Sequence, residues 1–179
     1  MPVPQRILVL GPSGAGKSTL ARCVGERLDH PVVHLDAIYW NPGWVQTEVG
    51  RFRERLAEAA AGDAWVMDGN YTSHLDFRLP RSEAVIWLPR YVYFPRTVWR
   101  TIRNYGWERD DVGPGCRERF DLAIFRDWVW TYPARSRPRH AQLLANLPPG
   151  FHGIILRSPA EVAKFIRNLP RSLDSGRNI

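Results

Sequence analysis

The chain has 179 residues, with 25 Lys and Arg against 18 Asp and Glu and therefore a net charge of +7. This length suits a single α/β domain covering residues 1–179, and no apolar run approaches the roughly 20 residues of a membrane span. The N-terminus lacks the pattern of a signal peptide, and Cys23 and Cys116 fit neither a disulfide framework nor a zinc site. We therefore expect a cytoplasmic protein, monomeric or weakly dimeric, without membrane contact.

The first apolar run, residues 7–10, predicts a buried strand, and a glycine-rich segment follows it directly. Glycines at the bends of such a loop let backbone N–H groups turn inward around phosphate oxygens, beside a helix N-terminus. Lys17 is expected against the β- and γ-phosphates, and the Ser18 hydroxyl on Mg²⁺. The segment predicts a site for ATP, and the nucleotide-binding residues are expected to be Gly11, Ser13, Gly14, Ala15, Gly16, Lys17, Ser18 and Thr19, with the helix proper beginning at Thr19.

Further apolar segments alternate with helical patterns along the rest of the chain. Short strands separated by helices predict a parallel sheet covered on both faces, that is, a three-layer α/β/α P-loop NTPase fold. The expected strands are residues 31–35, 64–67, 84–88 and 153–156. The expected helical faces are Leu20, Ala21, Val24 and Leu28; Phe52, Leu56, Ala59 and Ala60; Val98, Ile102 and Tyr105; and Val162, Phe165, Ile166 and Leu169.

Two carboxylates follow predicted strands at the edge where the phosphate loop should lie. Asp68, after the third strand, is positioned to hold the water shell of the metal ion. Asp36, after the second strand, is positioned to orient an acceptor hydroxyl or take its proton. Both could instead be capping or turn residues, since Asp is common at such boundaries and Asp68-Gly69 is itself a turn signal.

Arginines form the next group of candidate residues. Arg96, Arg100 and Arg103 are spaced by four and three residues, so a helix projects them from one face. Arginines aimed at a transferred phosphoryl group stabilise its charge, although such a row is also typical of a solvated helix face.

Residues 106–119, rich in glycine and charge, predict a small mobile lid. Its arginines, with Arg119 at its end, would arrive as the lid closes and expels water: Arg109, Arg117 and Arg119. Residues 170–179 are polar and aperiodic, which predicts a frayed tail.

Aromatic residues gather around the expected acceptor side: Tyr39, Trp40, Trp44 and Tyr71. These rings would either stack a base and line a pocket or close the core. The aromatic run over residues 120–132 is more typical of core packing by a helix.

The order of phosphate loop, Asp36, the Asp68-Gly69 pair, a helix with Arg96 and Arg100, and a glycine-rich lid resembles the adenylate-kinase-like branch of P-loop proteins. The segments His34-Leu35-Asp36, Met67-Asp68-Gly69-Asn70-Tyr71 and Arg119-Phe120-Asp121 are similar to the small proteins labelled topology modulation proteins.

That resemblance implies a five-stranded parallel sheet of order 2-3-1-4-5 with a small lid. It places Arg96 over the adenine, Arg100 at the phosphates and Asp68 near the metal. Adenylate kinases continue the Asp-Gly pair with an aromatic residue, Pro and Arg, whereas this chain has Asn70-Tyr71-Thr72. ATP as donor is therefore better supported than AMP as acceptor.

Taken together, these patterns predict a small kinase that moves the γ-phosphoryl group of ATP to a small hydroxyl or phosphate acceptor such as a nucleoside or nucleotide. The expected catalytic residues are Lys17, Asp36, Arg100 and Arg109, with Mg²⁺ at Ser18 and Asp68. An ATP-dependent regulator bound to nucleic acid is the alternative, and the net charge is compatible with it. However, the sequence carries no recognisable helix-turn-helix, zinc or RNA-binding signature.

Overall fold

The computed structural model describes residues 3–89, 93–121, 126 and 130–171, and its centre is a parallel sheet. The sheet has the order β2-β5-β1-β6-β7, and every neighbouring pair in it is parallel. Counted within this sheet alone, the order is 2-3-1-4-5, as the resemblance implied. The strands are β1 (Arg6–Leu10), β2 (Val32–His34), β5 (Trp65–Asp68), β6 (Ala84–Trp87) and β7 (His152–Ile155).

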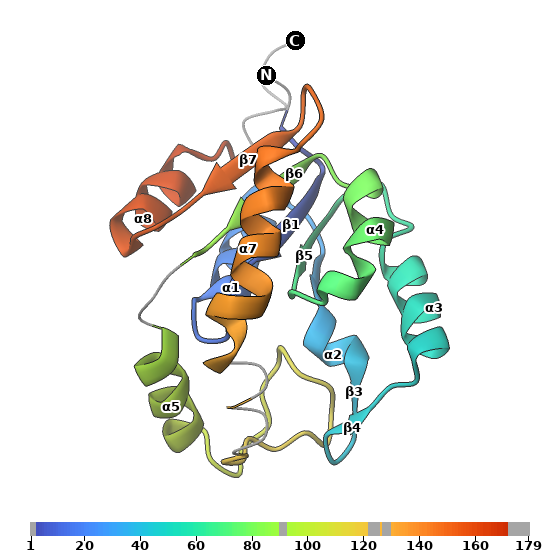
Figure 1. Cartoon of the computed structure of the whole chain (residues 1–179), viewed down its shortest axis with the longest axis vertical. Helices are drawn as coiled ribbons and strands as arrows, with labels where there is room; N and C mark the ends of the chain where they lie inside the picture. Colours follow the sequence, from blue (N-terminus) through green and yellow to red (C-terminus); the bar gives the residue numbers. More distant parts are fainter. Residues whose placement is uncertain (1–2, 90–92, 122–125, 127–129, 172–179) are drawn as a thin grey trace.

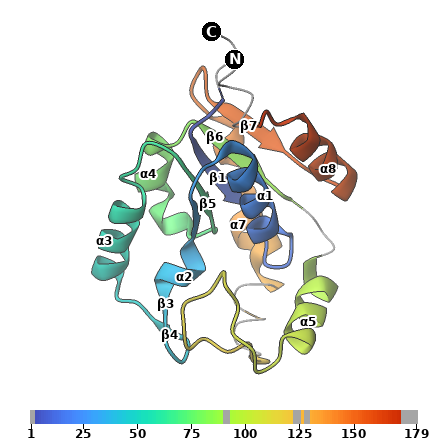
Figure 2. The same cartoon turned by 180° about the vertical axis from the view of Figure 1, so that it is seen from behind.

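Helices cover both faces of this sheet, so the predicted three layers are confirmed. Figure 1 shows α4 (Leu75–Arg78) and α7 (Tyr132–Ala145) in front of the sheet, and Figure 2 shows α1 (Lys17–Leu28) and α8 (Pro159–Asn168) on the other face. Side chains alternate along β1, so Ile7 and Val9 join the core under α1 while Leu8 and Leu10 join the other. The first helix begins at Lys17, two residues before the expected start.

A two-stranded antiparallel hairpin, which the sequence did not predict, lies between β2 and β5 in the chain. It consists of β3 (Trp40–Asn41) and β4 (Val45–Gln46) and follows α2 (Leu35–Tyr39). The helix α3 (Val49–Ala59) comes next and buries Phe52 and Leu56, as expected. Two short 3₁₀ turns, Thr72–His74 and Leu79–Arg81, flank α4.

The helix α5 (Tyr93–Arg103) differs from the sequence expectation. Ile102 is 59% exposed and Tyr105, beyond the helix end, is 64% exposed, whereas Thr97 and Thr101 are buried. The helix lies beyond the end of the sheet (Figure 1), so its polar face is the one that turns toward the protein. Periodicity located the helix but assigned the wrong face to the interior.

Four smaller expectations concern the rest of the chain. In the aromatic run over residues 120–132, Tyr132 is buried as expected, but Phe120 and Trp130 are exposed; residues 122–125 and 127–129 lie outside the described residues. The predicted tail also lies outside them beyond residue 171. Cys23 and Cys116 are both free thiols. Within the described ranges, no helix is long and apolar enough to cross a membrane.

Candidate functional site

A cavity of about 770 Å³ lies where the carboxyl ends of the strands meet α5 and the 106–119 segment. The strand ends bring together residues that are far apart in the sequence, as in other open α/β sheets. The segments after β1, β2 and β5 each contribute lining residues, namely Ser13, Gly14, Gly16, Lys17, Ser18 and Thr19; Asp36; and Asn70 and Tyr71.

The phosphate loop has the backbone that the motif requires. Gly11 and Gly16 have φ angles of 151° and 93°, and a Cβ on Gly11 would lie 2.8 Å from the carbonyl oxygen of Leu88. Gly16 is the N-cap of α1 and offers no side chain, so the first N–H groups of the helix stay available to an anion. Neither Gly11 nor Ala15 lines the cavity; the N–H of Ala15 donates within the loop to Pro12.

Lys17 lies at the floor of this loop, and its Nζ donates to the carbonyl of Pro12 at 3.2 Å. Burial lowers the pKa of Lys17, while the neighbouring carboxylates of Asp68 and Asp36 act in the opposite direction. The ammonium group is therefore held in a partly desolvated position between the loop and two carboxylates, where the phosphates of a nucleotide would be a further partner.

Asp36 faces the phosphate loop from the other side. Its Oδ1 accepts a hydrogen bond from the hydroxyl of Tyr71 at 2.6 Å. Burial raises the pKa of Asp36, although the bond from Tyr71 and the charge of Lys17 partly offset that effect. A carboxylate with a raised pKa, directed into a cavity, is suited to accept a proton.

Arg78, which the sequence did not single out, fixes the segment that carries Tyr71. Its guanidinium is fully buried and donates to the carbonyl oxygens of Gly69, Asn70 and Tyr71 at 3.1, 2.5 and 3.1 Å. Burial lowers the pKa of Arg78 to about 10. The same segment reaches the phosphate loop, because Asn70 Oδ1 accepts from the N–H of Gly11 at 3.0 Å. Arg78 therefore holds the segment that carries Tyr71 in place and, through Asn70, also supports the phosphate loop.

We expect Arg78→Met to lower the free energy of unfolding by about 3 kcal/mol, because three buried carbonyls lose a charged donor. Thermal unfolding would show this as a fall in Tm of roughly 6–12 °C. The matched control is Arg81→Met, because Arg81 is exposed and donates to the carbonyl of Phe77 alone among the described groups. Equal Tm values for the two variants would contradict this role of Arg78.

Asp68 lies beneath the cavity rather than in its lining. It is 4% exposed, and its Oδ1 contacts Nδ1 of His34 at 2.6 Å across the neighbouring strands β2 and β5. Burial opposes protonation of His34, but the hydrogen bond and the negative charge of Asp68 together outweigh it, so the pKa of His34 is raised. The role of Asp68 near a metal ion stays a prediction, and its pairing with His34 was not foreseen.

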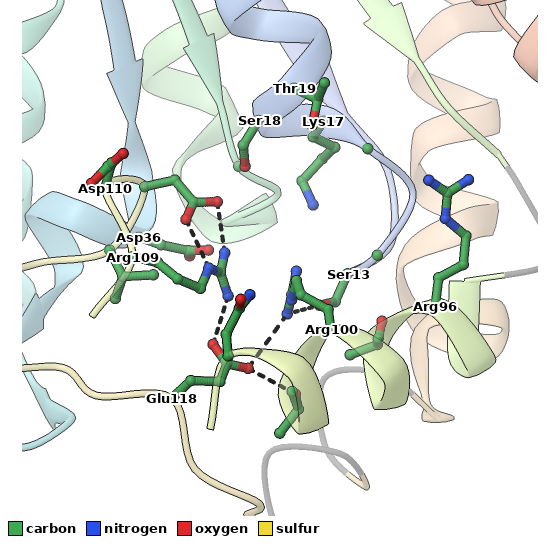
Figure 3. A pocket seen from close by; sticks show the side chains of 18 of the residues that line it. Ser13, Lys17, Ser18, Thr19, Asp36, Arg96, Arg100, Arg109, Asp110 and Glu118 are labelled. Atoms are coloured by element: carbon green, nitrogen blue, oxygen red, sulfur yellow. Dashed lines mark hydrogen bonds and ion pairs between the residues drawn. The ribbon is translucent and has the colours of Figure 1, made fainter. Parts of the chain in front are cut away.

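The arginines of α5 reach the donor side. Arg96, Arg100 and Arg103 all line the cavity, and Arg100 donates to the hydroxyl of Ser13 at 3.4 Å (Figure 3). The spacing of these arginines therefore indicated correctly that they share a face, and that face is turned to the cavity.

Arg109 extends into the cavity from the 106–119 segment. It binds Asp111 through two hydrogen bonds of 2.9 and 2.6 Å and Glu118 through one of 2.9 Å. Arg117 is exposed and does not line the cavity, and Arg119, which does, bonds to Asp121 at 3.2 Å. Of the three arginines expected to arrive with the lid, Arg109 is the one directed toward Ser18 and Asp36 (Figure 3).

Asp111 is a second residue that sequence reasoning missed. Burial alone would raise its pKa, but Arg109 and a hydrogen bond with the Ser18 side chain hold it far below the usual range. A hydroxyl and a carboxylate are hard oxygen donors that suit Mg²⁺ when substrate phosphates supply further oxygens. In the described part of the chain no group of three or more His, Cys, Asp or Glu could hold a metal ion by itself. These residues therefore fit a metal that is bound together with a nucleotide.

The aromatic residues divide between the two roles considered for them. Tyr39, Phe52 and Tyr71 pack together with ring centroids 4.8–5.1 Å apart and belong to the core, and Tyr71 also lines the cavity. Trp40 and Trp44 line the cavity, with their ring centroids 5.5 Å apart.

The 106–119 segment is docked on the β3–β4 hairpin. The N–H of Gly43 donates to the carbonyl of Gly115 at 3.0 Å, and Trp44 Nε1 donates to the carbonyl of Arg117 at 2.7 Å. The thiol of Cys116 donates to the carbonyl of Asn41 at 3.1 Å. The hairpin beside Asp36 therefore holds the segment that carries Arg109.

We expect Gly113→Ala to displace this segment, because the new Cβ would lie 2.4 Å from the carbonyl oxygen of Trp40 and 3.1 Å from that of Ala37. Overpacking of this kind costs about 1–3 kcal/mol, so acceptor-dependent ATP turnover should fall by about 10- to 100-fold. Gly62→Ala is the control, since its Cβ would approach nothing nearer than 3.7 Å. Unchanged turnover in Gly113→Ala would show that docking on the hairpin is dispensable.

Known proteins share this architecture. Shikimate kinase from Acinetobacter baumannii, solved in complex with shikimate, superposes with a TM-score of 0.51 at 18% identity, covering 98% of this chain and 96% of its own. Deoxyadenosine kinase from M. mycoides gives a TM-score of 0.50 at 14% identity, covering 94% and 98%. The chain has a P-loop kinase fold.

Comparison of sequences does not identify a family for this chain. No family model matches the chain. The uncharacterized protein YqaC of Bacillus subtilis (strain 168) is 26% identical over 157 residues, which is 80% of this chain and 84% of that protein. The resemblance to topology modulation proteins and the adenylate-kinase-like subtype stay expectations.

Proposed function

We propose that this protein is a small-molecule kinase that transfers the γ-phosphoryl group of ATP to a hydroxyl group of a small acceptor. The observation that carries the proposal is that one cavity contains a phosphate loop with Lys17 and, opposite it, the carboxylate of Asp36. A nucleotide-binding switch has no need of a partly buried carboxylate with a raised pKa beside the loop, whereas a transferase needs a proton acceptor there. The fold is shared with two proteins whose names identify them as kinases.

The donor half would bind ATP through the backbone of the phosphate loop. Lys17 would exchange its bond with the carbonyl of Pro12 for the β- and γ-phosphates. Arg96 is assigned to the adenine, and Arg100 and Arg109 to the oxygens of the transferred group, whose negative charge they would stabilise. Ser18 and Asp111, with Asp68 behind them, would hold Mg²⁺, which neutralises phosphate charge when bound.

The acceptor half would carry out the proton transfer. The acceptor hydroxyl oxygen attacks the γ-phosphorus, the bond from that phosphorus to the β,γ-bridging oxygen breaks, and its electron pair stays on ADP. The hydroxyl proton passes to the carboxylate of Asp36, which Tyr71 holds in place. Most of the rate enhancement would come from positioning and electrostatics.

Residues 106–119 would act as the lid of this single domain, with Arg109 delivered as it closes on the β3–β4 hairpin. Closure excludes water, which would otherwise compete with the acceptor for the phosphoryl group.

The deciding experiment supplies γ-labelled ATP and Mg²⁺ with a panel of nucleosides, nucleotides, sugars and hydroxy acids, and looks for label in a new product. We expect ATP turnover that rises with at least one hydroxyl compound. ATP binding without transfer to any of them, combined with steeply salt-dependent DNA binding, would instead support a nucleic-acid-associated regulator.

A further inference from the structure

The charges that line the cavity are divided between its two sides. Arg96, Arg100 and Arg103 line the cavity from α5, and Arg100 contacts Ser13 of the phosphate loop. Figure 3 shows Asp36 and Asp110 on the side away from Arg96. The donor side therefore has arginines available for phosphates, and the acceptor side presents carboxylates.

Two arginines close to the acceptor side, Arg55 and Arg78, donate their hydrogen bonds to other groups of the protein. Arg55 donates to the carbonyl of Ile38 at 2.9 Å, to the hydroxyl of Thr47 at 3.1 Å and to Asn41 Oδ1 at 3.4 Å. Arg78 is fully buried against the backbone of residues 69–71. Neither of these two arginines lines the cavity.

Two other arginines line the cavity in or beside the 106–119 segment: Arg109, which is already assigned to the transferred phosphoryl group, and Arg119. Arg109 binds Asp111 and Glu118, and Arg119 binds Asp121. Arg22 also lines the cavity, but it is exposed on α1, one turn beyond Ser18. Outside α5 and the 106–119 segment, Arg22 is the arginine of the described residues that lines the cavity. Binding of an anionic acceptor by Arg22 is therefore the alternative to test.

The remaining wall of the acceptor side is aromatic. Trp40, in β3, and Trp44, in the hairpin turn, line the cavity together with Asp36. Indole faces bind flat or ring-shaped neutral groups by stacking, and a carboxylate accepts from their hydroxyls. A second negative charge beside Asp36 would be repelled across a partly desolvated site.

We infer that the acceptor is an uncharged ring compound with hydroxyl groups, such as a nucleoside or a neutral sugar, and not the corresponding phosphate or carboxylate. This inference rests on the proposed function, because it identifies the acceptor of the same reaction. Trp40 and Trp44 hold the ring, Asp36 receives the reacting hydroxyl, and the arginines of α5 stay committed to ATP.

The test uses matched pairs that differ in one anionic group: adenosine and AMP, thymidine and dTMP, and glucose and glucuronate. Binding of each compound is measured by the change in tryptophan fluorescence in the presence of a non-hydrolysable ATP analogue and Mg²⁺, with Trp44→Phe identifying the signal of the acceptor side. We expect the neutral member of the preferred pair to bind at least tenfold more tightly. Which pair responds separates a nucleoside from a sugar.

Two variants show whether Asp36 causes the discrimination. Asp36→Asn should reduce the ratio between the neutral and the anionic member, because the repelling charge is gone. Arg22→Ala is the matched control and should leave that ratio unchanged. Tighter binding of the anionic member, lost in Arg22→Ala, would overturn the inference and assign an anion site to Arg22.

Acceptor-dependent release of ADP is then measured with the same pairs. A preferred neutral member that binds without ADP release would support the acceptor class and contradict phosphoryl transfer. Transfer to both members with equal kcat/KM would support the kinase and overturn the acceptor class. If neither member of any pair binds, both proposals fail.

Discussion

We expect Lys17→Ala to lower the rate of phosphoryl transfer by about 10²–10³-fold while leaving the fold intact. Lys17 lies between the phosphate loop and the carboxylates of Asp36 and Asp68, and it is the ammonium group placed to follow the charge of the transferred phosphoryl. Burial lowers its pKa, so its charge is held at a cost to folding. The Tm of Lys17→Ala should therefore be no lower than that of the unmodified protein.

Lys164→Ala provides the control for this variant, since Lys164 is the second of the two lysines in the chain and is exposed on α8. It should retain full activity. Initial rates of ADP release at saturating ATP compare the two variants, and a rate for Lys17→Ala within twofold of the control would remove Lys17 from the mechanism.

The second large effect is expected for Asp36→Asn, which should reduce acceptor-dependent turnover by about 10²–10⁴-fold, the usual contribution of a general base. The affinity for ATP should stay nearly constant, because the phosphates bind on the opposite side of the cavity. Asparagine keeps the size of the side chain and can still accept the hydrogen bond from Tyr71, so the lost function is the uptake of a proton.

The pH profile separates this role from a structural one. The carboxylate is the active form, and burial raises the pKa of Asp36, so turnover should fall as the pH drops through a value above the usual 3.9 of aspartate. That acidic limb should be absent from the residual activity of Asp36→Asn. Asp63→Asn, at an exposed loop position, should retain both the rate and the limb. Equal losses of ATP affinity and turnover in Asp36→Asn would instead assign Asp36 to the metal or to the structure.

Local sequence predicted the donor side of the cavity because the motif itself determines its backbone. Gly11 and Gly16 adopt the positive φ angles that their positions require, and Lys17 follows at the start of α1. The strand-end position of Asp36 followed from the alternation of apolar segments, since parallel strands bring their carboxyl ends to one edge.

The contacts that organise the acceptor side could not be predicted in the same way. Arg78 binds backbone carbonyls whose direction depends on the turn at residues 69–71, and an arginine in a polar stretch carries no periodic signal. The contact of Asp111 with Ser18 joins the 106–119 segment to the first turn of α1, which lies far away in the sequence. The expected strand order already placed β2 beside β5, but the register that sets His34 opposite Asp68 is seen only in the structure.

The contact between the β3–β4 hairpin and the 106–119 segment also offers a way to measure whether that segment opens. Cys116 is 1% exposed, and its thiol is enclosed where the lid meets Asn41. If residues 106–119 act as the proposed lid, an alkylating reagent in solution would reach this sulfur mainly while the segment is away from the hairpin. The rate of Cys116 alkylation would therefore report how often the segment opens. The partly exposed thiol of Cys23 in α1 serves as the internal standard.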